Sequence, residues 1–251
     1  MRSHILNTVL AGICLLLASI PAFASDAGES AWGYAGPQGP AHWGDLAAEY
    51  ATCKTGRSQS PINIISAKPA QLADLRFHYQ ATVLDIVNNG HTIQVNYAAG
   101  SSIEVGGKRY KLLQFHFHSP SEHAVDGRPY DMVAHLVHQA ADGQLGVIAV
   151  LMRKGKASPI IENIWTHLPR HAGDRKQADM QINITNLLPT GHRYYSYTGS
   201  LTTPPCSEGV NWMVLQTPVE VSADQIATFN NLFSGNVRPH QPLHERIIHA
   251  N

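Results

Sequence analysis

A series of short segments in which apolar and polar residues alternate limits the folds that this 251-residue chain can adopt. Alternation with a period of two is typical of strands that have one face in a core. Asn88-Asn89-Gly90-His91 separates two of these segments, and Asn-Gly between apolar runs is a strong β-hairpin signal. The predicted strands are Thr82–Val87, Thr92–Tyr97, Ser101–Val105, Leu112–His118, Met132–His138, Leu145–Met152 and Asn211–Thr217.

Helical patterns are few and short. Only Ile160–His167 and Ser222–Phe233 have the pattern of helices, and Gln225 follows Ser222 at the spacing of a capping box. Strands that are not regularly interleaved with helices favour a mainly antiparallel sheet. With 43% hydrophobic residues, a chain of this length can bury a sizeable core. We therefore predict a mainly β (α+β) single domain over residues 25–251.

Residues 1–24 have the pattern of a secretory signal peptide. Arg2 supplies the basic start, Ile13–Ile20 is the apolar middle, and Ala22-Phe23-Ala24 has small residues where a signal peptidase reads. A membrane span is the alternative, but the apolar run is too short for one. A lipoprotein signal built on Cys14 is disfavoured because a bulky residue precedes it. We expect an exported protein, periplasmic or secreted, without a membrane anchor.

Two cysteines, Cys53 and Cys206, follow the predicted signal peptide. In an oxidising compartment two cysteines favour a disulfide. The alternative is that they are zinc ligands, although no nearby Cys or His completes a finger-like spacing with either. Basic and acidic residues number 18 each, a balance without the electrostatic footprint of a partner such as nucleic acid or an anionic membrane.

Two of the 15 histidines share one strand face in Gln114-Phe115-His116-Phe117-His118. Because successive side chains of a strand point to opposite faces, His116 and His118 project together while Phe115 and Phe117 point to the core. Two imidazoles in this arrangement can bind one metal ion. Such pairs also occur by chance on strand surfaces, so a third ligand from another strand is needed.

The third ligand that we predict is His135, which lies in the apolar segment Val133–Val137. A histidine in so apolar a strand is usually a hydrogen-bonded core residue, but the nearby pair favours metal binding. Three neutral imidazoles suit Zn²⁺ and leave one tetrahedral position for water. His123 and His138 are competing candidates. His138 should point to the opposite strand face, and His123 follows the turn at Pro120.

At these residues the sequence resembles the alpha carbonic anhydrases, from Trp32 to Arg246. This resemblance implies a large, twisted, mostly antiparallel sheet with a few short peripheral helices and zinc in a conical cleft. It also implies a lyase that reversibly hydrates carbon dioxide to bicarbonate and a proton. The motifs that carry it are Gln59-Ser60-Pro61-Ile62-Asn63-Ile64, Asn88-Asn89-Gly90-His91, Gln114–His118, Ser121-Glu122-His123, His135-Leu136-Val137-His138, Gly199–Pro205, Arg238-Pro239 and Gln241-Pro242-Leu243.

The resemblance assigns roles residue by residue. It implies that Thr202 accepts a hydrogen bond from zinc-bound hydroxide and donates its own proton to Glu122, which aims the hydroxide at carbon dioxide. Zinc in these enzymes lowers the pKa of its water to about 7. His91 resembles the proton shuttle, since an imidazole titrates near pH 6.5. The implied zinc ligands are His116, His118 and His135.

The implied cleft has an apolar wall for carbon dioxide and a polar wall that orders water. A disulfide between Cys53 and Cys206 matches one of the exported members. The apolar residues are Val137, Val147, Leu201, Val210 and Trp212, and the polar ones are Tyr34, Asn89, Gln94, Gln114 and the substrate-side Thr203.

Each zinc ligand also needs a partner for its second nitrogen. Gln114 resembles the partner of His116, and the carbonyl just before Arg246 resembles that of His118. Many relatives place a glutamate two residues before His135, where this chain has Val133, which cannot accept a hydrogen bond.

Two alternatives belong to other functional classes. One is a non-catalytic binding module on the same fold, although such relatives typically lack one or more zinc histidines. The other is a zinc esterase or other hydrolase as the main role. A homodimer is compatible with the sequence, which leaves the oligomeric state open.

Overall fold

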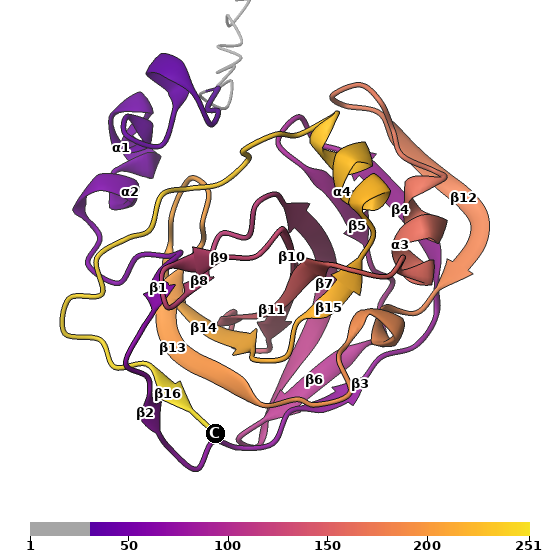
Figure 1. Cartoon of the computed structure of the whole chain (residues 1–251). Helices are drawn as coiled ribbons and strands as arrows, with labels where there is room; N and C mark the ends of the chain where they lie inside the picture. The colour runs from indigo at the N-terminus through magenta and orange to yellow at the C-terminus, as the bar shows by residue number, and fades with distance from the viewer. Residues whose placement is uncertain (1–30) are drawn as a thin grey trace, which may run out of the picture.

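The computed structural model describes residues 31–251, so the predicted signal peptide lies outside the described residues. The predicted fold class is confirmed. The described chain forms a large twisted sheet of 13 strands, and short helices lie at its periphery (Figure 1). Most strand pairs are antiparallel; the parallel pairs of this sheet are β11 with β14, β11 with β15, and β16 with β2.

The strand order of the large sheet places β10 near its centre, between β7 and β11. In spatial order the strands are β12 (Arg175–Ile182), β4 (Thr82–Asn88), β5 (Ile93–Asn96), β7 (Lys108–His118), β10 (Met132–Ala140), β11 (Leu145–Lys154), β14 (Glu208–Leu215), β13 (Tyr194–Ser200), β16 (His249–Ala250) and β2 (Lys68–Pro69). Off this path lie β3 (Arg76–His78), β6 (Ser102–Val105) and β15 (Val219–Val221), and a separate sheet contains β1 (Asn63–Ile64), β8 (Ala124–Val125) and β9 (Arg128–Pro129).

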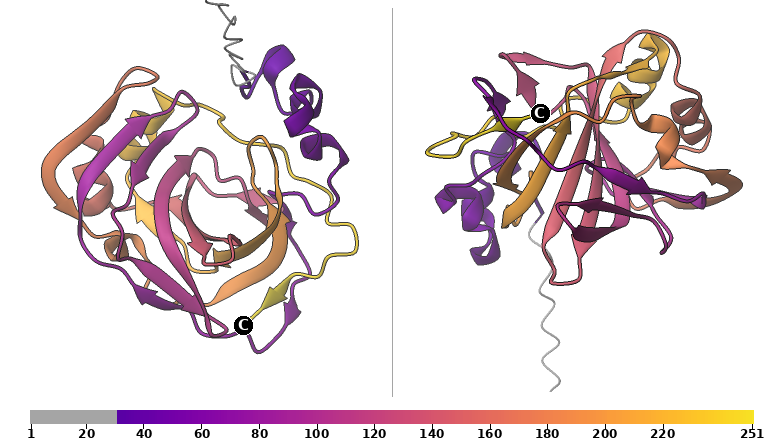
Figure 2. Two further views of the ribbon diagram at one scale, coloured as in Figure 1. Left: turned by 180° about the vertical axis from the view of Figure 1, so that it is seen from behind. Right: turned by 90° about the horizontal axis from the view of Figure 1, so that it is seen from below.

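Short helices flank the sheet on two sides. The N-terminal helices α1 (Trp43–Leu46) and α2 (Thr52–Thr55) lie on the opposite side of the molecule from α3 (Pro159–Trp165) and α4 (Ala223–Asn230), as Figures 1 and 2 show. The predicted capping box at Ser222 and Gln225 is present at the start of α4. No helix within residues 31–251 is long and apolar enough to cross a membrane. Three 3-10 helices complete the elements: η1 (Gly36–Gln38), η2 (Ala48–Tyr50) and η3 (Ile184–Leu187).

Strand β10 is buried on both faces, and this burial separates two apolar clusters. Ala134 and Leu136 belong to the first cluster, which also contains residues of α3 and α4. Val133 and Val137 belong to the second cluster, on the other face of the strand. By the period of the strand, His135 lies on the face of the second cluster.

The predicted hairpin joins β4 to β5 in antiparallel register. Gly90 has a positive φ of 85°, but Asn89 does not take the left-handed conformation. Instead, the Asn89 side chain accepts hydrogen bonds from the backbone N–H groups of His91 and Thr92. The turn is therefore held by a side-chain acceptor, and it fixes the backbone position of His91.

Candidate metal centre

The three predicted ligands come together on one face of β7 and β10. These strands are antiparallel, with His135 opposite His116 and with Val133 opposite His118. One ring nitrogen of each histidine lies within 4.8 Å of a ring nitrogen of each of the other two, and the structure described for residues 31–251 contains no other group of three possible metal ligands of this kind. Local period and strand register together produce this cluster.

The outer nitrogens of two ligands have protein acceptors. Gln114 Oε1 accepts from His116 Nδ1 at 2.9 Å, in the place that the sequence predicted. Asn236 O accepts from His118 Nδ1 at 2.7 Å. The prediction that the carbonyl just before Arg246 is this partner is therefore wrong. The guanidinium of Arg246 instead binds loop carbonyls at Leu243 and Pro242. Both ligands thus keep Nε2 for a metal.

Asn236 is a residue that no local motif identified. It lies 118 positions from His118 and is buried. Its side chain accepts from the backbone N–H of Ser119 and donates to the carbonyls of Phe117 and His91. One asparagine therefore holds the end of β7 and the candidate shuttle turn in a fixed relation.

The third ligand lacks an outer partner. His135 Nδ1 and His118 Nε2 lie 3.8 and 3.6 Å from the same oxygen, Glu122 Oε2, so the two nitrogens border the same space. His135 Nε2 is buried, and no described group forms a hydrogen bond with it. No other described residue thus supplies the acceptor that the side chain of Val133 cannot provide.

The cluster has the chemical state that a cation requires. Burial lowers the pKa of His116 and of His135 well below 6.5, and the neighbouring imidazoles lower it further by a smaller amount. Both rings are therefore neutral and able to bind a metal. His118 Nε2 and Glu122 Oε2 are buried polar atoms without a hydrogen-bond partner in the described chain. Such atoms are costly unless something satisfies them, and a divalent ion among three imidazoles does so for the histidine. The residues therefore fit zinc.

Glu122 is held from the opposite side. Its Oε1 accepts from the backbone N–H of Arg238 at 2.9 Å, while its Oε2 has no hydrogen-bond donor among the described residues. The hydrogen bond from Thr202 that the resemblance implied is consequently not formed in this structure. Thr202 is buried, two residues beyond the end of β13.

The structure forms the disulfide between Cys53 and Cys206, and the zinc-ligand alternative for these cysteines is wrong. The disulfide belongs to a wider network. The buried guanidinium of Arg238 donates to Gln59 Oε1 and to the carbonyls of Ser60 and Cys53. Gln59 in turn donates to the carbonyl of Cys206. These contacts hold the loop that carries Thr202 against the α2 region.

The polar residues predicted for the cleft line one cavity of about 120 Å³ beside His116 and His118. His91 stacks on Trp32 with ring centres 3.7 Å apart and planes 7° from parallel. Burial and the nearby Glu122 raise the pKa of Tyr34 well above 10, so this phenol stays neutral. The predicted residues that line the cavity are Tyr34, Asn89, His91, Gln94, Gln114 and Thr203.

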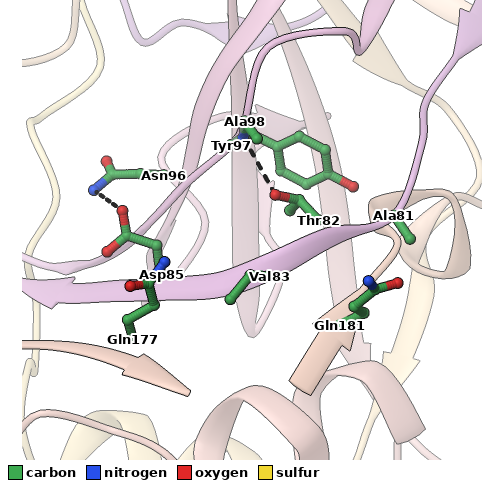
Figure 3. A pocket seen from close by; sticks show the side chains of 9 residues that line it. All are labelled: Ala81, Thr82, Val83, Asp85, Asn96, Tyr97, Ala98, Gln177 and Gln181. Carbon is green, nitrogen blue, oxygen red and sulfur yellow. Dashed lines mark hydrogen bonds between the residues drawn. The ribbon is translucent and has the colours of Figure 1, made fainter. Parts of the chain in front are cut away.

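Gln94 is oriented by a chain of polar contacts that leads away from the cleft. Its Nε2 donates to Asn96 Oδ1, Asn96 Nδ2 donates to Asp85 Oδ2, and Arg175 donates to both oxygens of Asp85. Figure 3 shows Asn96 and Asp85 in a separate surface cavity between β4, β5 and β12. The hydrogen bond from Arg175 lowers the pKa of Asp85, and burial raises it by less. The pKa of Asp85 therefore lies below its ordinary value.

The predicted apolar residues gather on the ligand face of β10. Their side chains belong to the second cluster, against which Leu201 packs from the loop beyond β13. The wall thus comes from three neighbouring strands and one loop. Its buried members are Val137, Val147, Val210 and Trp212.

The two competing histidines do not join the ligand group. His123 is buried, and its Nε2 is bonded to the Tyr197 hydroxyl at 2.7 Å. His138 is bonded to the Tyr79 hydroxyl at 2.8 Å, on the side of the first cluster. Burial lowers the pKa of His138 to about 4.

A mostly antiparallel sheet that carries three converging histidines near its centre is the arrangement of a protein that can hold a metal ion. Residues 38–251 match the family model for eukaryotic-type carbonic anhydrase. The chain is 44% identical over 229 residues to a carbonic anhydrase of Nostoc sp., covering 86% of this chain and 84% of the relative. It is 43% identical over 238 residues to one of Pectobacterium atrosepticum, covering 94% and 97%.

The solved alpha-carbonic anhydrase of Thermovibrio ammonificans, in complex with sulfanilamide, is similar with a TM-score of 0.87 and 45% identity. The match covers 88% of this chain and all of that chain. This chain therefore belongs to the carbonic anhydrase family, and it is an enzyme that interconverts carbon dioxide and bicarbonate.

Proposed function

We propose that this enzyme hydrates carbon dioxide with one zinc ion held by His116 Nε2, His118 Nε2 and His135 Nδ1. The observation that carries the proposal is the convergence of three imidazole side chains, two of them oriented by Gln114 and Asn236. When bound in carbonic anhydrase, zinc acts as a Lewis acid that makes a water molecule acidic, with a pKa of about 7.

Glu122 and Thr202 are proposed to orient the nucleophile. The backbone N–H of Arg238 fixes one carboxylate oxygen, and the other faces the ligands as an open acceptor. A threonine whose proton is committed to that oxygen can only accept from its other neighbour. Catalytic hydrogen bonds often tighten only in the loaded site, which reconciles this role with the open contact.

The apolar cluster is proposed to receive carbon dioxide. Val137, Val210 and Trp212 present buried carbon surface on the face that carries His135. A linear apolar molecule loses nothing by contacting such a wall, whereas water cannot form hydrogen bonds there. The wall therefore keeps the substrate position dry and next to the reacting centre.

His91 is proposed to carry the released proton to solvent. It lines the polar cavity with His116, and stacking on Trp32 sets its ring orientation. An imidazole with a pKa near 6.5 accepts and releases protons with little cost at neutral pH. Asn236 and Asn89 hold its backbone from both sides.

We further propose export followed by removal of residues 1–24, which makes the mature enzyme periplasmic or secreted. The disulfide supports this proposal because such bonds persist in oxidising compartments.

The test combines metal analysis with stopped-flow hydration of carbon dioxide. Wild type should hold one zinc per chain, and His135→Ala should lose both zinc and activity. His78→Ala, at an exposed histidine of β3, is the matched control and should keep both. Wild type that hydrates carbon dioxide without stoichiometric zinc would contradict the proposal.

A main role as an esterase makes a different prediction. Its catalytic efficiency on an aryl ester would then equal or exceed that on carbon dioxide. The proposed carbon dioxide wall predicts the opposite order.

A further inference from the structure

Two buried imidazole nitrogens behind the ligand cluster have no hydrogen-bond partner among residues 31–251. They are His135 Nε2 and His123 Nδ1. The two ring centres lie 6.1 Å apart, and both rings pack against Trp212 at 4.9 and 4.6 Å. Orphaned donors or acceptors at full burial are rare in native proteins, and neighbouring ones call for a common explanation.

The hydrogen-bond network decides which nitrogen of His123 carries the proton. Ser60 Oγ accepts from the Ser200 N–H, and its other hydrogen-bond partner among residues 31–251 is Tyr197 Oη, in a contact where either oxygen can donate. The buried Ser60 proton has a described acceptor only when it goes to Tyr197 Oη, and we assign it there. Tyr197 then donates to His123 Nε2 at 2.7 Å. Because neutral imidazole has one N–H, His123 presents Nδ1–H as a donor.

His135 presents a second donor. With Nδ1 committed to the metal, as the proposed function requires, the proton of the neutral ring sits on Nε2. Neither N–H can serve the other, because both are donors. Two N–H···O bonds of about 2.9 Å span up to about 5.8 Å between nitrogens, which suits rings at this spacing.

We infer that His123 and His135 share one internal acceptor, a single buried water molecule, and that His123 is thereby a positioning residue for the metal ligand His135. Val133, two residues before His135 and on the same strand face, leaves this acceptor position to water. A carboxylate at position 133 would accept from both N–H groups directly. This inference rests on the zinc site of the proposed function.

The first test needs no variant. In a high-resolution crystal structure of the zinc-loaded protein, one water should lie within about 3.2 Å of both nitrogens. Imidazole NMR should show Nδ1–H on His123 and Nε2–H on His135, both in contact with water. A dry position, or a proton on His123 Nε2, overturns the inference.

The second test measures zinc release to a chelator rather than activity. Val133→Glu should slow release by about 10-fold or more, since partners behind metal ligands are worth 10–100-fold in affinity. Val133→Met, which fills the position without an acceptor, should speed release by a similar factor. Equal release rates for wild type, Val133→Glu and Val133→Met overturn the inference. Should Val133→Glu not fold, Val133→Met and the wild-type structure still decide.

The two proposals fail in different ways. If wild type binds no zinc, the proposed metal site itself fails. If wild type binds zinc and hydrates carbon dioxide, yet shows no bridging water and no response at position 133, only the shared acceptor fails.

Discussion

Removing the disulfide tests how the loop that carries Thr202 is held. The change is the double substitution Cys53→Ser with Cys206→Ser. The disulfide closes a loop with a sequence separation of 153. In the chain-entropy model, opening such a loop in the unfolded state costs about 5 kcal/mol of stability. Strain relief in the native state can offset part of this, so we expect a loss of about 3–5 kcal/mol.

The assay is equilibrium urea unfolding of the zinc-loaded protein, followed by tryptophan fluorescence. A loss of this size corresponds to a melting temperature lower by about 6–20 °C for a domain of this length. Lys54→Ala is the control, because it removes an exposed ion pair with Asp45 beside Cys53 and should change stability by less than about 0.5 kcal/mol. A loss below about 1 kcal/mol for the double variant would refute the loop-closure reasoning.

Activity gives a second, independent measurement on the same variant. Cys206 donates its backbone N–H to the Thr203 carbonyl, so the disulfide holds the loop beside the site. We expect catalytic efficiency to fall even at temperatures where the variant is fully folded. Unchanged efficiency in verified folded protein would show that Arg238 and Gln59 hold the loop without the disulfide.

Three further predictions concern buried or stacked side chains. Burial lowers the pKa of His138 to about 4, so between pH 6.5 and pH 4 this side chain is protonated in the unfolded chain but neutral in the native state. The free energy of unfolding therefore falls as the pH drops from 6.5 towards 4. At about pH 4.5 this loss is about 2–3 kcal/mol. In urea unfolding at neutral pH and at pH 4.5, His138→Gln should therefore lose about 2–3 kcal/mol less unfolding free energy on acidification than wild type does. Arg238→Lys cannot reach three acceptors at once, so unfolding free energy should fall by about 3 kcal/mol, whereas exposed Arg76→Lys should leave it unchanged. Trp32→Ala removes the ring against His91, so kcat should fall about two- to ten-fold in dilute buffer, with kcat/KM unchanged and recovery in imidazole buffer.

Local sequence patterns were enough to predict the fold class and the shared strand face of two of the three candidate ligands. Period two places His116 and His118 on one face of β7, and it sends Phe115 and Phe117 into the core, where both are fully buried. Strand alternation located every predicted strand to within a few residues. Such patterns are readable because each depends on residues close together in the chain.

Strands β12 and β13 were not predicted from the sequence, because their residues do not alternate in a way that marks a strand. Residues 194–200 combine three tyrosines, two serines, a threonine and a glycine, and they are ordered by pairing with β14 and β16 rather than by their own alternation. Arg175–Ile182 pairs with β4 through an irregular register, which breaks the period that would have marked it.

The remaining contacts of the site depend on residues that are far apart in the chain. The register of β10 against β7 brings His135 to the pair, and the acceptor for His118 comes from Asn236, far along the chain. The same structure leaves His135 Nε2 without an acceptor and places the donor of His123 near it. Local periodicity fixes which way a side chain points, but only strand register and loop placement fix what it meets.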